Sequence, residues 1–184
     1  MWEKTSAAGF LVGQGNILID EDNLLNTSYG DNQKSGSKLA NILHDYIVPG
    51  ISLTLKTSLA YGTDILCQKL EYAKQNDFLV CMYYIAIDNP WEAAERIENR
   101  VQKGGRNVPM AEIVDSYRHR WERLSKLIPF CDQVTLFDNN NGFQKIGAYK
   151  ENALTIYSQD IPMWMQEFIQ YFGAEPTILT KEEW

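Results

Sequence analysis

The residue types and spacing best suited to chemistry lie between positions 96 and 109. Arg96 and Arg100 are one helical turn apart, so they share a face of any helix that contains both. The Gly104–Gly105 pair is expected to end that helix, and Arg106 follows it in a short loop. Because a guanidinium is a planar fork that is always charged, it matches the oxygens of a phosphate group well. The pattern predicts an anion clamp carried on a helical flap.

An ordinary surface helix would explain the same arginines. Glu92 lies four residues before Arg96, in the order that favours an ion pair on a solvated face. The charge distribution favours a ligand, since residues 96–126 carry eight Lys or Arg against four Asp or Glu in a chain of net charge -7. An acidic chain with one basic segment suits a small anionic ligand and disfavours nucleic acid. From the residues alone, both interpretations stay open.

Two aspartates follow the first apolar segment. Asp20 and Asp22 come directly after Ile17–Ile19. Either carboxylate could hold a metal ion through water or accept a proton from a hydroxyl group. Aspartate is also a common cap at the start of a helix, and this is the favoured interpretation of Asp20.

Polar residues follow a second apolar segment, Ile51–Leu55, which alternates with the period of a strand. Hydroxyl groups at this point could bind phosphate or the hydroxyls of a substrate, or they could cap the next helix. The residues concerned are Lys56, Thr57 and Ser58.

Two further polar clusters follow longer apolar segments. Asp88 and Asn89 come after residues 78–87, and the run from Asp138 through Asn139 to Gly142 comes after residues 134–137. A turn is the simplest explanation of the second run, because Asn, Asp and Gly are the commonest turn residues. A functional alternative is contact with a nucleotide base.

The elements that would position these residues alternate along the chain. Strands are predicted at Asn16–Ile19, Ile51–Leu55, Phe78–Ile87 and Val134–Phe137, and a weaker one at Ala153–Tyr157 that could form an edge hairpin with Gly147–Lys150. Helices are predicted at 39–47, 64–75, 90–104, 113–128 and 165–172. This alternation predicts an α/β fold with a mostly parallel sheet, in which the almost continuous apolar segment 78–87 is a central strand. Ligands of such sheets bind beyond the carboxyl ends of the strands, which places all four polar clusters along one edge.

Composition excludes several classes of protein. A chain of 184 residues with 45% hydrophobic residues is long enough to bury a core, and it is expected to form a single domain. Its longest apolar segment is too short to cross a bilayer, and its first residues lack the order of a signal peptide. Three widely spaced cysteines and two histidines predict neither disulfides nor a metal site. These features favour a cytoplasmic protein that contacts no membrane.

The order of the motifs is similar to that of a known family. An Ile-x-x-Asp element at 19–22 precedes Leu-x-Thr-Ser-Leu at 55–59. Pro90-Trp-Glu-Ala-Ala, the two arginines, a Gly-Gly-x-x-Val-Pro element and Leu136-Phe-Asp-Asn139 then follow. Over roughly residues 17–172 the chain resembles the zeta-toxin-like P-loop kinases, often described as predicted ATPases.

That resemblance implies a three-layer P-loop kinase-like fold with a helical lid and a phosphotransferase activity. The enzyme would move the terminal phosphate of ATP, with Mg²⁺, to a hydroxyl of a nucleotide sugar such as a UDP-N-acetyl sugar. Asp22 matches the aspartate that takes the hydroxyl proton, while Arg96 and Arg100 match the lid arginines. Asp138 and Asn139 match an element near the adenine. The resemblance also implies an antitoxin-like protein as a possible partner.

The chain departs from the family pattern at several points. The family begins with G-x-x-x-x-G-K-[ST], whose backbone N–H groups and lysine hold phosphates, and the residues before Ile17 contain no Gly-Lys-Ser or Gly-Lys-Thr. On the acceptor side, Lys56 replaces a glutamate, Arg106 replaces a histidine and Ser116 replaces an arginine. We therefore expect the first β-loop-α unit to be missing or degenerate and kinase activity to be impaired. A non-catalytic anion-binding, nucleotide-binding or protein-interaction module of the same fold is the alternative.

Overall fold

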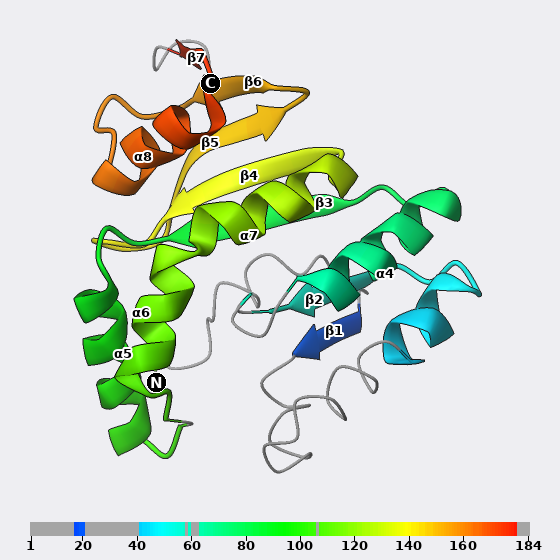
Figure 1. The fold of residues 1–184 in the computed structure, drawn as a ribbon, viewed down its shortest axis with the longest axis horizontal. Helices are drawn as coiled ribbons and strands as arrows, with labels where there is room; N and C mark the ends of the chain where they lie inside the picture. Colours follow the sequence, from blue (N-terminus) through cyan, green and yellow to red (C-terminus); the bar gives the residue numbers. More distant parts are fainter. Residues whose placement is uncertain (1–16, 21–40, 58, 60–62, 106, 180–184) are drawn as a thin grey trace. The chain divides into compact units, whose positions relative to one another are not determined.

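The structure is a computed structural model that describes residues 17–20, 41–57, 59, 63–105 and 107–179. Its elements fall into two compact units, residues 1–79 and residues 80–184. The chain is α/β, as the alternating pattern predicts (Figure 1). None of the helices in the described ranges combines the length and the apolar character needed to cross a membrane.

The first unit contains a parallel pair of strands. β1 (Ile17–Asp20) pairs with β2 (Leu53–Lys56) in a register that puts Asp20 opposite Lys56. Residues 41–47 are helical, and α4 (Asp64–Gln75) has the bounds that the sequence predicts. The ring of His44 stacks on that of Tyr72 with centroids 5.6 Å apart, which joins the two helices.

The second unit is built on a mixed five-stranded sheet with the order β3-β4-β5-β6-β7. The strands are β3 (Cys81–Ala86), β4 (Gln133–Asp138), β5 (Gln144–Lys150), β6 (Ala153–Ile156) and β7 (Pro176–Ile178). β3 and β4 are parallel, β5 is antiparallel to both of its neighbours, and β7 is parallel to β6. The prediction of a mostly parallel sheet is therefore wrong for this unit, because the chain reverses twice, once between Asp138 and Gln144 and once at Glu151–Asn152.

Two helices cover one face of this sheet. The buried core joins Trp121 and Leu124 of α7 (Arg120–Leu127) to Trp164, Met165 and Phe168 of α8 (Met163–Phe172). The strands contribute residues from one face to this core: Ala86, Val134, Leu136, Ile146, Tyr149, Leu154 and Ile156. The hydrophobic stripes of both helices thus meet a single sheet face, as amphipathic helices on a sheet must.

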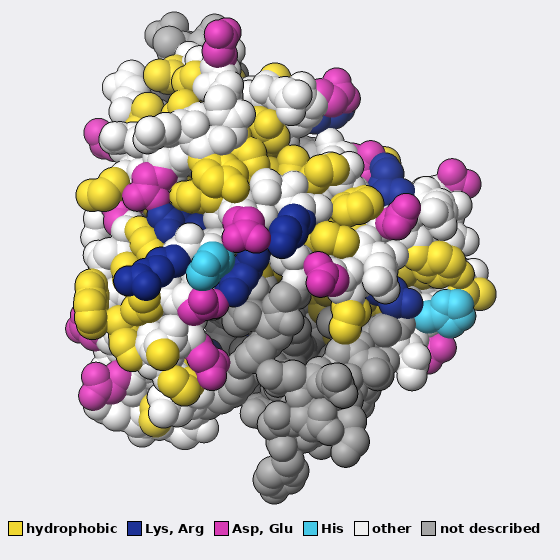
Figure 2. All heavy atoms as spheres, in the orientation of Figure 1, with side chains coloured by type: hydrophobic (Ala, Val, Ile, Leu, Met, Phe, Trp, Pro, Cys, Tyr) yellow, Lys and Arg dark blue, Asp and Glu magenta, His cyan; other side chains and the backbone are white. Residues whose placement is uncertain are grey.

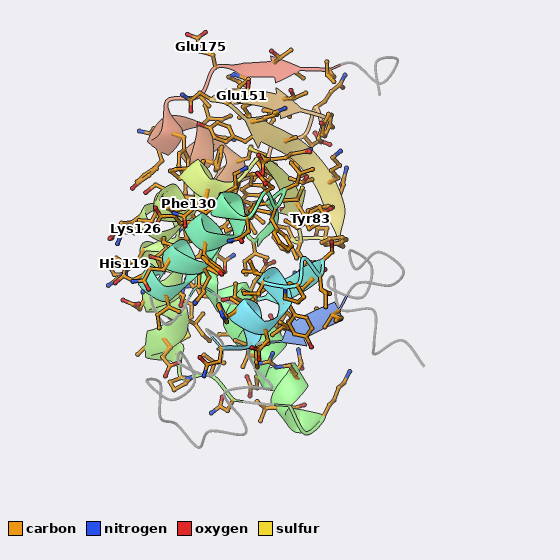
Figure 3. The ribbon with its side chains drawn as sticks, turned by 90° about the vertical axis from the view of Figure 1, so that its right-hand side faces the viewer. Tyr83, His119, Lys126, Phe130, Glu151 and Glu175 are labelled. Carbon is orange, nitrogen blue, oxygen red and sulfur yellow. The ribbon has the colours of Figure 1, made fainter. Side chains whose placement is uncertain are left out.

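β3 differs from its predicted role as a central strand. It is the edge strand of the five-stranded sheet in the described part of the chain. Tyr83 and Ile85 lie on the face away from the core and are 45% and 38% exposed. Figure 3 shows Tyr83 on the opposite side of the sheet from His119 and Lys126, which belong to the α7 side. A continuous apolar segment is therefore not sufficient to place a strand in the middle of a sheet.

The predicted helix over 113–128 is two helices and a 3-10 turn. α6 (Met110–Arg118) ends at His119, α7 begins at Arg120, and η1 (Ile128–Phe130) follows. The guanidinium of Arg120 donates a hydrogen bond to the carbonyl of Tyr117 at this break. The side chain thus satisfies a carbonyl that a continuous helix would have bonded internally.

Candidate functional site

Two strand ends meet at one edge of the second unit. In the parallel pair of β3 and β4, Ala86 lies opposite Asp138, and Asp88 follows two residues after the end of β3. The N–H of Asn139 donates to the carbonyl of Ala86 over 2.9 Å, which extends the pairing past the last strand residue. The sequence predicts that these two polar clusters share one edge of the sheet, and the structure confirms this.

Asn140 joins the two aspartates. Its side-chain Nδ2 donates to Asp88 Oδ2 over 2.9 Å and to Asp138 Oδ1 over 2.8 Å. Its Oδ1 accepts the N–H of Asp88 over 2.9 Å, and its own N–H donates to Asp138 Oδ2 over 3.2 Å. One amide side chain therefore satisfies an N–H group and two carboxylates from separate strands.

Trp164 connects the same aspartates to α8. Its backbone N–H donates to Asp88 Oδ1 over 2.9 Å, and its indole Nε1 donates to Asp138 Oδ1 over 2.7 Å. Pro162, at the N-cap of α8, makes no side-chain capping bond. Asp88 supplies the missing acceptor from 76 residues away, and its charge also complements the positive end of the helix. We refer to Asp88, Asp138, Asn140 and Trp164 as the strand-end cluster.

The helix that carries the predicted clamp and the helix that follows it are both attached to this cluster through main-chain carbonyls. Arg96, on α5 (Pro90–Gln102), donates from its guanidinium to the carbonyl of Asn140 over 2.9 Å. Tyr117, on α6, donates its hydroxyl to the carbonyl of Asp88. Burial raises the pKa of Tyr117, and Glu167 and Asp88 add to this effect while Arg120 opposes it. The hydroxyl therefore keeps the proton that this bond requires.

Arg120 braces α6 and α7 against α8. Its guanidinium carbon lies 3.6 Å from the ring centroid of Tyr117 and 4.6 Å from that of Trp121, and its fork pairs with Glu167 of α8. The side chain is only 13% exposed. The cation–π contacts and the Glu167 carboxylate together compensate the charge of this largely buried guanidinium. Tyr117 is thus held from both sides, by Arg120 and by the end of β3.

Arg96 lies between two acceptors. Besides Asn140, it approaches Glu92, whose Oε2 is 4.0 Å from its Nη2. That carboxylate oxygen is buried and makes no hydrogen bond, so Glu92 interacts with Arg96 mainly through charge. The helix itself begins as predicted, with Pro90 in its first turn and Asn89 Oδ1 accepting the N–H of Glu92 over 2.9 Å. The guanidinium is therefore held at the strand ends while its side chain remains 40% exposed.

Arg100 has a different setting from Arg96, although the two were predicted to act together. It is exposed on α5 and packs over the loop that ends the helix. A Cβ built on Gly105 would lie 2.5 Å from Arg100 Cγ and 2.9 Å from its carbonyl oxygen. Glycine at 105 lets the Arg100 stem lie against the main chain. Arg106, the third predicted clamp residue, lies outside the described residues.

The remaining predicted site residues belong to the first unit. Thr57 Oγ1 accepts the N–H of Leu59 over 3.3 Å, a local turn contact, and Leu59 adopts a φ of 57°. Lys56 ends β2 opposite Asp20. Asp22 and Ser58 lie outside the described residues. Their roles as base and substrate contact stay predictions.

The charged surface around α6 and α7 is mixed. Figure 2 shows basic side chains interspersed with acidic ones over these helices. Arg123 pairs with Asp115 over 2.6 Å and Lys126 with Glu122 over 3.1 Å. The hydrogen bond from Arg123, aided by His119, lowers the pKa of Asp115. Several basic side chains of residues 96–126 are thus paired with acidic ones, whereas Arg96 holds its guanidinium at the strand ends.

The strand-end cluster does not fit a Mg²⁺ site. Both oxygens of each aspartate accept hydrogen bonds from Asn140 or Trp164, whereas Mg²⁺ demands a near-octahedral set of oxygen ligands. No group of three or more His, Cys, Asp or Glu side chains gathers within the described ranges. The carboxylates serve the protein's own donors in this arrangement.

Sequence reasoning places Asp88, Asn89 and the run from Asp138 to Asn140 at one edge of the sheet, but it misses two residues that the structure brings there. Tyr117 and Trp164 read as members of apolar stripes. The Tyr117 hydroxyl and the Trp164 indole reach the cluster through contacts across 29 and 26 residues. Only Pro162, an N-cap without a capping side chain, hinted that α8 needs an acceptor from elsewhere.

No protein-family model, curated protein or solved structure matches this chain.

Proposed function

We propose that this chain binds a small phosphorylated ligand at the carboxyl ends of β3 and β4, as a homologue of the zeta-toxin-like phosphotransferases. The observation that carries the proposal is the bond from Arg96 to the carbonyl of Asn140, which fixes an exposed guanidinium at the ligand edge of a parallel strand pair. A guanidinium has five N–H donors, so one hydrogen bond leaves others for a phosphate group. The ligand class is a nucleotide or a nucleotide sugar.

In the enzyme form of this proposal, ATP donates its terminal phosphate to a hydroxyl of the second ligand. Arg96 and Arg100 offset negative charge on the transferring group, which is the main contribution of protein to such reactions. The family resemblance assigns acceptance of the hydroxyl proton to Asp22 and contacts with the acceptor to Lys56, Thr57, Ser58 and Arg106. Asn139 is the better candidate for the nucleotide contact, because Asp138 already accepts bonds from Asn140 and Trp164.

A binding module without turnover is the second candidate. It is favoured by the aspartates of the strand-end cluster, which serve Asn140 and Trp164 in place of a metal ion. Such a module would use the Arg96 edge for a nucleotide and could pair with an antitoxin-like protein. Binding of ATP without a phosphorylated product would support this candidate. Formation of phosphorylated UDP-N-acetylglucosamine, abolished by Asp22→Ala, would support the enzyme.

Arg96→Ala is expected to weaken ATP binding by roughly tenfold or more, since a charge-assisted hydrogen bond contributes about 1.5 to 3 kcal/mol. Isothermal titration calorimetry on the full chain measures this. Arg118→Ala is the matched control, because Arg118 is an exposed arginine at the C-terminal end of α6. Equal affinities of the two variants would contradict the proposal.

Glu92→Gln is expected to strengthen ATP binding by about two- to fivefold. The carboxylate 4.0 Å from Arg96 offsets part of its charge, and partly exposed pairs of this kind are worth about 0.2 to 1 kcal/mol. The gain should shrink as salt is added, because salt screens exposed charges. Glu98→Gln, on the same helix, provides the comparison. A loss of affinity in Glu92→Gln would show that the carboxylate orients Arg96 and does not compete with the ligand.

A further inference from the structure

We propose that Asn140 is a positioning residue for Arg96: its side chain, held between Asp88 and Asp138, fixes the carbonyl that orients the guanidinium. This inference rests on the proposed function, since Arg96 is its anion contact. It concerns a residue that makes no contact with the ligand itself and acts through its main-chain oxygen.

Asn140 uses each of its polar groups inside the protein. Its Nδ2 bonds both aspartates, its Oδ1 takes the N–H of Asp88 and its own N–H bonds Asp138. Its carbonyl oxygen is then the acceptor for Arg96. The residue is half-buried and follows β4 by two positions. These four hydrogen bonds therefore determine the direction of the Asn140 carbonyl, which accepts the fifth hydrogen bond from Arg96.

The side-chain amide is specific to this place. A donor must lie between two carboxylates while an acceptor faces the Asp88 N–H, and only an amide carries both groups on one planar end. This requirement also determines which amide atom is oxygen, because the reversed orientation would set Oδ1 against two carboxylates. Aspartate at 140 has almost the same shape but would place a third carboxylate between the other two.

Orientation matters because Arg96 is a long side chain with partial exposure. Without an acceptor at the strand end, its several torsion angles would sample many rotamers, and binding would have to order them. The Asn140 carbonyl orders the guanidinium before a ligand arrives. Tyr117, bonded to the carbonyl of Asp88, holds the next helix to the same strand ends, so the frame around Arg96 is rigid on two sides.

The decisive experiment compares Asn140→Asp in two backgrounds, the natural chain and Arg96→Ala, with ATP affinity measured by calorimetry. In the natural background the variant is expected to bind about three- to tenfold more weakly. In the Arg96→Ala background it should cause no further loss, because residues that act through one another are not additive. An equal loss in both backgrounds would overturn the positioning role.

A second arm needs no ligand. Phenylglyoxal modifies accessible guanidinium groups, and peptide mass spectrometry reads the rate at each arginine. Asn140→Asp is expected to raise the rate at Arg96 at least twofold while the rate at Arg118 stays constant. No change at Arg96 would refute the inference. If the natural chain does not bind ATP, the proposed function fails, and this arm still decides the role of Asn140.

A milder variant guards against misfolding. Asn140→Ser removes the side-chain bonds to both aspartates without adding a charge, and its thermal melt reports whether it folds. The labelling rate at Arg96 should rise in this variant as well. Unchanged labelling in a folded Asn140→Ser protein would count against the proposal as firmly as unchanged labelling in Asn140→Asp.

Discussion

Replacing Trp164 with alanine is expected to lower the free energy of unfolding by about 3 to 5 kcal/mol, the range for truncating a large buried aromatic side chain. Trp164 is 0% exposed and lies in the core between the sheet and α8. Its indole also donates to Asp138 at the strand ends. Urea unfolding followed by far-UV circular dichroism measures the loss without relying on tryptophan fluorescence.

Trp164→Phe separates the hydrogen bond from the packing. Phenylalanine retains most of the apolar contacts but leaves Asp138 Oδ1 without its indole donor. Since a bond to a charged acceptor contributes about 1.5 to 3 kcal/mol, this variant should lose about 2 kcal/mol. If Trp164→Phe is as stable as the natural chain, the bond from the indole to Asp138 has no energetic weight, and Asn140 and the backbone N–H of residue 164 are sufficient to hold the strand-end cluster.

The consequences of Trp164→Ala should reach the proposed ligand edge. α8 would lose one of the two bonds that tie its first turn to the strand-end cluster, while the backbone bond to Asp88 remains. Asp138 would then depend on Asn140 for its position. We expect weaker ATP binding in Trp164→Ala than in Trp164→Phe, because both variants lose the indole bond but only alanine also loses the packing that holds the first turn of α8 in the core.

Local patterns predict much of the fold because local interactions decide it. The bounds of α4 match its apolar stripe, and α5 begins where Pro90 and the Asn89 cap indicate. The hairpin of β5 and β6 is also predicted. The sequence predicts it at the edge of the sheet, whereas in the structure β7 pairs in parallel with β6 and lies outside it. A three-residue strand such as β7 carries too little periodicity to be recognised.

Errors arise where distant residues decide the structure. The break between α6 and α7 depends on Arg120, whose side chain bonds Tyr117 on one helix and Glu167 on another. The apolar run of β3 predicts burial on both faces, but within the described ranges it pairs only with β4, which leaves it at an edge of that sheet. Neither outcome follows from the spacing of apolar residues.

The same distinction between local patterns and contacts of distant residues applies to the candidate site. The topology of parallel strands predicts that Asp88 and Asp138 share an edge, since each comes directly after an apolar segment. The donors that satisfy Asp88 lie 52 and 76 residues away, and the indole that reaches Asp138 lies 26 residues away, so no local pattern encodes these contacts. The bonds from Asn140 to Asp138 span only two residues. The proximity of Arg96 to this edge is implied only by the family resemblance, and the structure places its guanidinium at Asn140.

Gly147→Ala should be the most disruptive of the small substitutions in the second unit, with a loss of about 3 kcal/mol. A Cβ at this position would lie 2.6 Å from the carbonyl oxygen of Thr155 and 3.6 Å from Met165 Cε. The first of these atoms belongs to the main chain of the neighbouring strand, so it cannot rotate away as a side chain can. Overpacking of this kind costs about 1 to 3 kcal/mol, and the rigid main-chain neighbour puts Gly147→Ala at the upper end.

The expected damage extends to the strand-end cluster because of the local pairing. Gly147 lies opposite Leu136, and the register between β4 and β5 shifts between Leu136 and Phe137, directly before Asp138. A bulge at this point sets the direction in which β4 leaves the sheet. Movement of β5 should therefore displace Asp138 and weaken ATP binding along with stability.

Gly173→Ala provides the matched control for Gly147→Ala. Gly173 ends α8 with a φ of 59°, and an added Cβ there meets nothing within 4 Å, so only the left-handed backbone opposes alanine. That strain amounts to about 1 to 2 kcal/mol and lies away from the strand ends. Thermal and urea unfolding should rank the control as milder, with ATP binding retained. Equal losses of stability in the two variants would contradict the expected clash with the Thr155 carbonyl, and full ATP binding in Gly147→Ala would contradict the expected displacement of Asp138.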